Sequence, residues 1–406
     1  MQTRLAFPFF KFALILVVLA SIIGAVILPT VEANFLTLRI SLATLSARQI
    51  PAEIPLTIWK DRTPNRSTLQ ANKIRLGQAL FFDKRLSANG TISCGTCHDP
   101  AMAFASSESI AVGSATGTRN APTVLNAAFA KSYFWDGRVK TLEDQAKQPL
   151  LNAAEMGMTS EAVLVHRLSS ITEYRKQFKK VFRKEGISIQ TVAAAIAAYE
   201  RTLVSRNSAF DRYIEGDSRA LTDVQKRGWE LFSGKAKCIE CHTYSRSSPF
   251  FTDSLFHNTG VGTDSATLTL LDQRAQTLSA SPDVNEIGLL AHTPGSSQLG
   301  RFLVTRRWED LAAFKTPTLR DVELTGPYMH DGSFDTLLDV VRFYNRGGVK
   351  NRMLDKKIGP LELTEQEMSE LVEFMRALTS DDVLKLMQSS QPQTREKVFL
   401  PVKGSD

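Results

Sequence analysis

Cysteine and histidine are scarce in this chain of 406 residues, which contains only four cysteines and six histidines. All four cysteines fall in two pentapeptides, so none is left over for a disulfide or a free reactive thiol. No long basic run or base-stacking motif accompanies the formal charge of +7, which argues against a nucleic-acid partner. Alternating strand patterns are almost absent, and the sequence therefore predicts an all-α protein.

The two pentapeptides span residues 94–98 (CGTCH) and 238–242 (CIECH). Each is a C-x-x-C-H motif, in which two thioethers hold a haem and the histidine ligates its iron. A disulfide or a zinc knuckle is the alternative, but zinc pairs need further ligands at short range and none follow. We therefore predict two covalently bound haem c groups. The residues concerned are Cys94, Cys97 and His98 for the first haem and Cys238, Cys241 and His242 for the second.

Residues 1–33 resemble an export signal. Arg4 and Lys11 precede an uncharged apolar stretch from Phe12 to Leu28. A buried core helix is the alternative to such a targeting segment. The stretch just reaches the length that spans a bilayer, so a cleaved signal peptide and an uncleaved membrane anchor both stay open. Either one predicts a periplasmic location for the haem domains, where c-type haem is attached.

The remaining chain predicts two tandem cytochrome-c-like haem domains with loop insertions. A proline-containing linker at 34–68 leads to an N-terminal haem domain at 69–215 and a C-terminal one at 216–380. Residues 381–406 form a tail with one short helix. The Ser-, Thr- and Gly-rich stretch at about 262–300 predicts an inserted loop. Helices are expected at 74–82, 140–150, 160–182, 188–204, 333–344 and 364–379, and a further helix begins at Thr222 and leads to Cys238.

Further iron ligands are few. The remaining histidines are His166, His257, His292 and His330. His166 lies in a predicted helix and reads as a surface or satisfied histidine, and methionines such as Met102, Met156 and Met158 stay open as alternatives. We therefore expect the first haem to be open or water-ligated. An open iron is what peroxide binding requires, whereas a six-coordinate haem only passes electrons.

Six further segments resemble the bacterial dihaem cytochrome c peroxidase family, and within it the MauG-like branch. They occur in family order between about 70 and 380. The segments are 76–83 (LGQALFFD), 119–126 (RNAPTVLN), 134–138 (FWDGR), 155–157 (EMG), 314–320 (FKTPTLR) and 326–332 (GPYMHDG). The resemblance implies an oxidoreductase that acts on hydrogen peroxide.

The resemblance also implies roles for matching residues. Trp135 corresponds to the aromatic side chain between the two haems, where an oxidisable indole carries an electron hole; the alternative is a core tryptophan. Glu155 corresponds to the distal acid that relays a proton during O–O cleavage, the alternative being a solvated helix residue. Gln145 and Pro149 match the same pocket. Asn120, Thr325 and Pro327 match a calcium site, whose oxygen ligands suit a hard cation.

The second haem separates the two branches of the family. Ordinary members place a methionine fourteen positions after the histidine that matches His330, and this chain has Tyr344 there, as the MauG-like branch does. A phenolate ligand stabilises ferric and higher states, where methionine raises the potential. Met329, Met353 and His257 are rival ligands. Many members also carry a blocking histidine in the segment that matches 110–118; its absence here predicts activity without reductive activation.

We therefore expect a haem peroxidase that reduces hydrogen peroxide with electrons from a small cytochrome c or a cupredoxin. The alternative is MauG-like long-range oxidation of aromatic residues in a partner protein. Residues 235–237 (KAK) offer no aromatic exit for that reaction, although Trp229 and Tyr244 are substitutes. An electron-carrying dihaem cytochrome without catalysis is a third hypothesis. A monomer and a homodimer both stay open.

Overall fold

Residues 71–280 and 287–390 are described by the computed structural model of the protein. The predicted signal or anchor at 1–33 and the linker at 34–68 lie outside this part of the chain. The described residues belong to one compact unit that spans Asp61–Asp406. None of the helices in this described part is long and apolar enough to cross a membrane.

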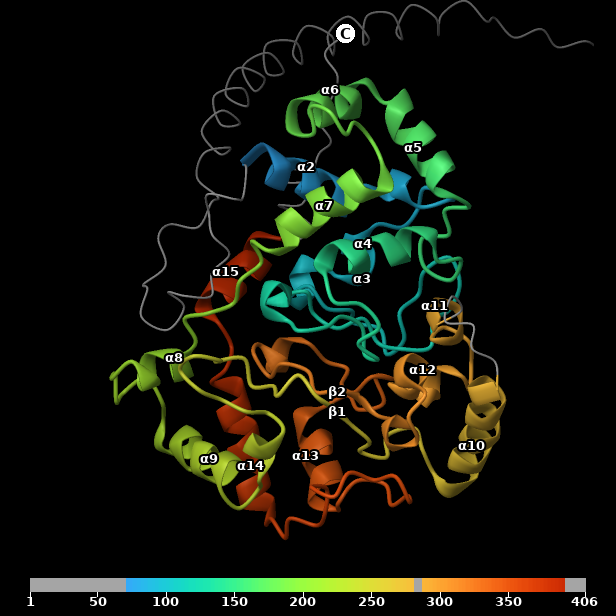
Figure 1. Ribbon diagram of the computed structural model, residues 1–406. Coiled ribbons are helices and arrows are strands. Elements are labelled where there is room, and N and C mark those ends of the chain that lie inside the picture. The colour runs from blue at the N-terminus through green and yellow to red at the C-terminus, as the bar shows by residue number, and fades with distance from the viewer. Residues whose placement is uncertain (1–70, 281–286, 391–406) are drawn as a thin grey trace, which may run out of the picture. The chain divides into compact units, whose positions relative to one another are not determined.

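The structure is mostly helical, as predicted, and its single sheet is a pair of two-residue strands (Figure 1). The first half contains α2 (Ala71–Phe81), α3 (Cys94–Cys97), α4 (Leu142–Leu151), α5 (Glu161–Ser170), α6 (Thr172–Val181) and α7 (Ile189–Glu200). The second half contains α8 (Ala209–Ile214), α9 (Asp223–Ser233), α10 (Ser265–Ala280), α11 (Ile287–Leu290), α12 (Phe302–Thr305), α13 (Leu337–Asn345), α14 (Glu365–Arg376) and α15 (Asp381–Ser389). Strands β1 (Phe256–His257) and β2 (Phe314–Lys315) pair antiparallel.

The same helix crossing occurs once in each half of the chain. Helix α2 packs against α7 at Gly77, where an added Cβ would lie 1.8 Å from the carbonyl oxygen of Ala195. Helix α9 packs against α14 at Gly228, where a Cβ would lie 2.0 Å from the carbonyl oxygen of Glu370. Both glycines stand in the same G-x-x-L-F pattern, Gly77 to Phe81 and Gly228 to Phe232. Only glycine permits this backbone contact, and the repetition supports the predicted tandem arrangement.

Capping residues explain why several helices begin where they do. The Thr222 hydroxyl accepts from the backbone N–H of Gln225, whose side chain accepts in return from the N–H of Thr222. Thr364 and Glu367 form the same reciprocal pair at the start of α14. Such boxes satisfy backbone donors that the first turn leaves unpaired. Both starts agree with the sequence prediction.

The inserted loop predicted at about 262–300 is wrong, because α10 occupies much of it. Leu268, Leu271 and Ala275 are buried at helical spacing and pack in a small apolar cluster. The hydroxyl groups that suggested a loop bond within the helix, as Thr277 Oγ1 does to the carbonyl of Gln273. The helix expected at 160–182 is likewise two helices, which meet at Ile171.

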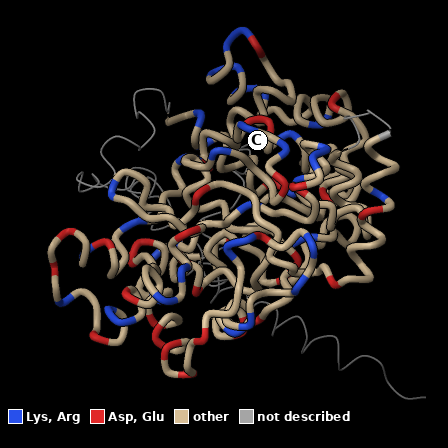
Figure 2. The backbone as a smooth tube through the Cα atoms, turned by 60° about the horizontal axis from the view of Figure 1, so that its bottom comes forward, with Lys and Arg blue, Asp and Glu red and all other residues tan. Residues whose placement is uncertain are grey.

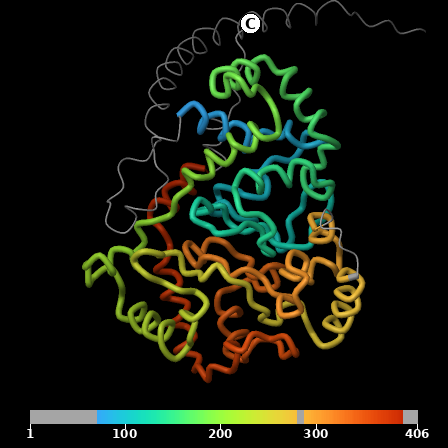
Figure 3. The backbone as a smooth tube through the Cα atoms, viewed as in Figure 1, coloured from blue at the N-terminus to red at the C-terminus, as the bar shows by residue number. Residues whose placement is uncertain are grey.

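Three apolar clusters form the core. The first gathers residues between Leu76 and Leu203, the second residues between Phe210 and Leu378, and the third α10 with residues up to Ala312. Helix α15 departs from this order, because Val383 is buried in the first cluster and Met387 packs against it. Figure 3 shows this red helix reaching back beside the first half of the chain. Part of the predicted tail is therefore core.

Charge does not gather on one segment. Figure 2 shows basic and acidic residues interspersed along the described chain. A deeply buried ion pair joins Arg320 to Asp211 through two hydrogen bonds, with nitrogen–oxygen distances of 2.7 and 2.8 Å. Arg320 Nε also donates to the carbonyl of Pro249 at 2.7 Å. These bonds tie α8 to the loop that follows β2.

Candidate active site

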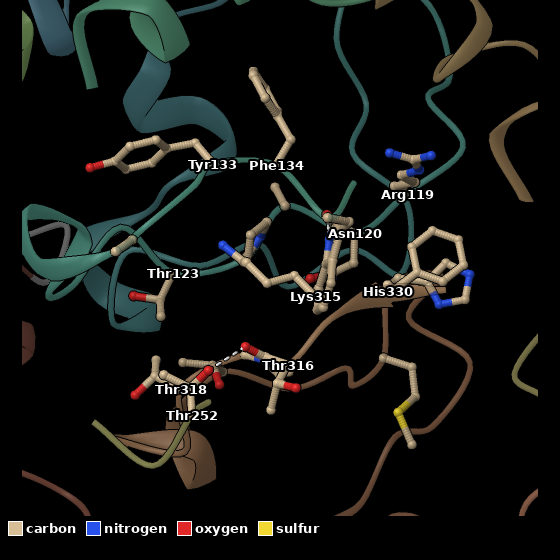
Figure 4. A pocket seen from close by; sticks show the side chains of 18 of the residues that line it. Arg119, Asn120, Thr123, Tyr133, Phe134, Thr252, Lys315, Thr316, Thr318 and His330 are labelled. Carbon is tan, nitrogen blue, oxygen red and sulfur yellow. Dashed lines mark hydrogen bonds between the residues drawn. The ribbon is translucent and has the colours of Figure 1, made fainter. Parts of the chain in front are cut away.

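One cavity of about 580 Å³ runs between the two halves of the chain. Figure 4 shows labelled side chains from the 119–134 region and from the 252 and 315–330 regions around this pocket. All the residues predicted for haem attachment, catalysis and calcium line it. They are Cys94, Cys97, His98, Asn120, Trp135, Gln145, Glu155, Cys238, Cys241, His242, Thr325, Pro327 and Tyr344.

The two motif histidines are held in the same way. The Nδ1 of His98 lies 3.3 Å from the carbonyl oxygen of Phe104, and the Nδ1 of His242 lies 3.0 Å from that of Phe251. Both phenylalanines adopt positive φ, of 57° and 52°. Burial lowers the pKa of both imidazoles, which favours the neutral form. A carbonyl on Nδ1 would leave Nε2 free to bind iron.

The residues present fit two haem groups. All four motif cysteines line the cavity, where their sulfur atoms can form the thioethers. Among the described residues, the buried Nε of Arg119 has no hydrogen-bond partner, although Arg119 lines the cavity. A guanidinium N–H without a partner could donate a hydrogen bond to a carboxylate of the haem.

Glu155 lies in the loop after α4, and backbone hydrogen bonds from the segment at Ser114 and Ala115 hold this loop in place. Its carbonyl accepts from the N–H of Ser114 at 2.7 Å, and the carbonyl of Ala154 accepts from the N–H of Ala115 at 3.1 Å. An added Cβ on Gly113 would lie 2.4 Å from the Ala154 carbonyl and 2.6 Å from the Cα of Glu155. The close approach therefore requires glycine. The Glu155 side chain is half-buried and lies in a loop, so the alternative of a solvated helix residue does not apply.

A histidine that the sequence analysis gave no role meets this carboxylate. The Nε2 of His292 lies 2.6 Å from Oε1 of Glu155, and both residues line the cavity. The Nδ2 of Asn152 lies 3.3 Å from the same oxygen and 3.0 Å from Nδ1 of His292. The only sequence signal was that His292 was one of four unassigned histidines. Nothing local in the chain places it beside Glu155.

Hydrogen bonds from both halves of the chain hold Trp135 in place. It is 9% exposed, its indole N–H donates to the carbonyl of Asn120 at 2.9 Å, and its carbonyl accepts from the N–H of Lys315 at 2.8 Å. The neighbouring Asp136 is buried between Arg119 and Arg138. Burial raises the pKa of Asp136, but these two guanidinium groups outweigh it and lower the pKa. The indole therefore has a single defined position beside the cavity.

Tyr344 faces the cavity from α13, and burial raises the pKa of its hydroxyl. Within the described part of the chain, no residue forms a hydrogen bond with that hydroxyl. Its rival His257 has both ring nitrogens engaged, Nε2 by Asp253 at 2.9 Å and Nδ1 by Asp355 at 2.6 Å. Hydrogen bonds, the strongest of them to Asp253, raise the pKa of His257. Because both ring nitrogens are bonded to carboxylates, neither is free to bind iron, which favours Tyr344.

The sulfur candidates divide in two. Met156 and Met329 line the cavity, and so does Met375 of α14, which the sequence analysis did not consider. Met353 packs against the third apolar cluster. Met102 and Met158 are not among the described residues that line the cavity. His166 is exposed on α5, as predicted.

Comparison with known proteins agrees with this geometry. The family model described as di-haem cytochrome c peroxidase matches residues 71–219. Methylamine utilization protein MauG of Methylorubrum extorquens is 36% identical over 344 residues, which is 84% of this chain and 86% of that protein. Cytochrome c551 peroxidase of Nitrosomonas europaea is 34% identical over 87% of this chain and 92% of its own.

A solved structure extends the likeness to the fold. The crystal structure of a MauG-like protein associated with microbial copper homeostasis superposes with a TM-score of 0.65 at 30% identity. The match covers 86% of this chain and 98% of that one. The relatives therefore span both pentapeptides and the cavity between them. With this coverage and identity, the chain belongs to the di-haem cytochrome c peroxidase family.

Proposed function

We propose that this protein reduces hydrogen peroxide to water with electrons from an external donor. The family implies two haem cofactors. When bound, the haems supply the iron chemistry, with peroxide reduced at the first and donor electrons arriving at the second. The observation that carries the proposal is the carboxylate of Glu155, paired with His292 in the cavity that the first haem motif also lines.

Glu155 is the proposed proton carrier. Cleavage of the O–O bond requires that a proton move from one peroxide oxygen to the other, so that water leaves instead of hydroxide. A half-buried carboxylate that faces the cavity can accept and return that proton. Gln145 lines the same cavity from α4 and is the proposed hydrogen-bonding neighbour. The backbone hydrogen bonds at Ala154 and Glu155 hold the loop in place, so the Glu155 side chain stays beside the cavity.

Trp135 is the proposed relay for electrons between the two sites. It lines the cavity together with both pentapeptides, and hydrogen bonds at its indole and its carbonyl restrain it. A restrained, buried indole transfers an electron without a change of position. Tyr344 is the proposed second ligand of the haem at Cys238 and Cys241, because its hydroxyl faces that part of the cavity without another partner in the described residues.

Oxidation of a partner protein is the second candidate function, and one observation favours it. Trp229 and Tyr244 belong to an aromatic cluster, with ring centroids 6.0 Å apart and a tilt of 80°. Tyr244 also contacts Phe251, whose carbonyl is bonded to His242. Two oxidisable rings therefore lie near the second haem motif, although residues 235–237 offer none. One relative is itself named for methylamine utilisation.

The finer assignments also remain proposals. A small cytochrome c or a cupredoxin is the proposed donor, and one relative is named for cytochrome c551. Asn120, Thr325 and Pro327 all line the cavity, which supports a calcium ion held by their oxygens. We propose a periplasmic location, because the N-terminus resembles an export signal. Whether that segment is cleaved or stays as an anchor, and whether the protein is a monomer or a dimer, are questions for experiment.

The decisive experiment adds one equivalent of hydrogen peroxide to the purified, fully ferric holoprotein and records its optical and near-infrared spectrum. We expect a rapid spectral change without prior reduction. Steady-state turnover with a reduced small cytochrome c should follow. If the spectrum changes only after one haem is reduced, another ligand blocks the first iron, and the argument from the open pocket is wrong. Fast cross-linking or oxidation of a partner without donor turnover would favour the second candidate.

A further inference from the structure

The stretch that was expected to be a loop contributes Ala291 and His292 to the lining of the cavity. Helix α10 and the short α11 pack through the third apolar cluster, in which Ala291 is 1% exposed. The hydroxyl of Thr118 donates to the carbonyl of Ala291 at 3.0 Å, across 173 residues of sequence. Thr118 lies in the segment that would carry a blocking histidine in relatives. The next residue, His292, therefore enters the cavity from a fixed backbone.

The contacts of His292 favour one arrangement of its protons. Its Nδ1 lies 2.7 Å from the carbonyl oxygen of Gly288, which only accepts, and 3.0 Å from the amide nitrogen of Asn152, which only donates. The shorter contact is with the carbonyl, which favours a hydrogen on Nδ1. Its Nε2 lies 2.6 Å from Oε1 of Glu155. Either Nε2 carries a second proton and donates it to the carboxylate, or Glu155 is protonated and donates to Nε2. In both arrangements one proton is shared between Glu155 and His292.

Peroxide reduction makes that shared proton useful. The overall reaction is H₂O₂ + 2 H⁺ + 2 e⁻ → 2 H₂O, so the pocket must take up two protons from solvent while the donor supplies two electrons. Moving a proton between the peroxide oxygens returns Glu155 to its starting state. The two further protons are needed by the remaining oxygen as the donor electrons arrive, and they must enter through the pocket. The side chains of His292 and Glu155 are 17% and 25% exposed and both line the cavity, so water can reach the pair.

We propose that His292 is a positioning residue that holds the Glu155 carboxylate toward the cavity and passes protons to it from solvent. This inference rests on the proposed peroxidase function and adds to it a residue from the inserted segment. The other described histidines do not serve this pair: His257 is bonded to two carboxylates beside the second motif, and His330 is bonded to Gln298.

The test compares His292→Gln, His292→Leu and a double variant with Glu155→Gln in the holoprotein. Glutamine keeps a polar contact with Glu155 but carries no exchangeable acid proton, and leucine removes the contact. We expect kcat for peroxide to fall about tenfold to a hundredfold, the size of a lost hydrogen bond to a charged group, while KM changes little. The solvent isotope effect on kcat should rise, because proton delivery becomes limiting.

Two further readouts separate this role from a structural one. The rate of cyanide binding to the ferric protein should fall in both single variants, because hydrogen cyanide must lose a proton to a pocket base when it binds. The double variant should be no slower than Glu155→Gln alone, because His292 acts only through Glu155. His166→Gln, an exposed histidine on α5, is the matched control and should change nothing.

Several outcomes would overturn the inference. Wild-type values of kcat and of the cyanide rate in His292→Gln and His292→Leu would show that the pair is not used. A ferric spectrum that loses a ligand in His292→Gln would make His292 an iron ligand instead. Should the leucine variant lose haem, the glutamine variant decides alone. If the wild type does not reduce peroxide, the proposed function fails, and the cyanide rates still test the pair.

Discussion

Replacing Glu155 by glutamine is the sharpest perturbation of the proposed chemistry. Glutamine has the same shape and keeps one oxygen as an acceptor for the Asn152 amide, now 3.3 Å from Oε1. It cannot exchange a proton with peroxide. Positioned acid–base groups contribute about 10²–10⁴ in rate, so the barrier should rise by about 3–5 kcal/mol. The fall should lie in kcat, because the pocket keeps its shape.

The assay is steady-state peroxide reduction with a reduced small cytochrome c, at saturating peroxide. Haem content per chain, measured by absorbance, should equal that of the wild type. The unfolding free energy should change by no more than about 1 kcal/mol, since the Glu155–His292 pair is only partly buried. Glu161→Gln, at an exposed position at the start of α5, is the matched control. A kcat within threefold of the wild type, with full haem content, would refute the assignment of Glu155.

Three further predictions concern the second haem, the loop that carries Glu155 and the core. Tyr344→Met should raise the reduction potential of one haem and produce the absorption of methionine-ligated ferric haem, and an unchanged redox titration would show that another residue holds that iron. Gly113→Ala should lower turnover at normal haem content, because the new Cβ would displace the Glu155 loop; unaltered kinetics would contradict this. Asp211→Ala should destabilise the fold by about 3–5 kcal/mol in urea titrations, because it leaves Arg320 buried without its partner. Burial raises the pKa of Asp211, but Arg320 outweighs this and lowers it below the unfolded value of 3.8. The stabilisation is therefore complete above that value and is lost as pH falls through the folded pKa, and the difference in stability between wild type and variant should shrink there.

Sequence was sufficient where chemistry is set by local spacing. The two C-x-x-C-H motifs need only five consecutive residues, and the capping pairs at Thr222 and Thr364 need only four. Tyr344 and Glu155 came from the family resemblance, and the structure brings both to the cavity. Their roles as ligand and acid stay predictions.

Sequence was insufficient where long-range contacts decide. Helix α10 was missed because its serines and threonines resemble a loop, while its burial depends on Phe302 and Leu303 further along the chain. His292 was missed because nothing near it in sequence indicates that Asn152, 140 residues earlier, lies 3.0 Å away. Both failures concern the same inserted segment. Other lining residues, such as Ile196 of α7 and Met375 of α14, also lie outside the segments that the family resemblance identified.

The position of α15 constrains how the molecule can be assembled and how it can be divided. The first apolar cluster lacks part of its packing until Val383 and Met387 have been synthesised. A nascent chain that stops earlier exposes apolar surface which the finished protein buries, and such surface promotes aggregation. A first haem domain excised at residue 215 would lack part of its own core. The beginning and the end of the described chain therefore complete their packing together. Any split or truncated version of the protein has to keep α15 with the N-terminal half.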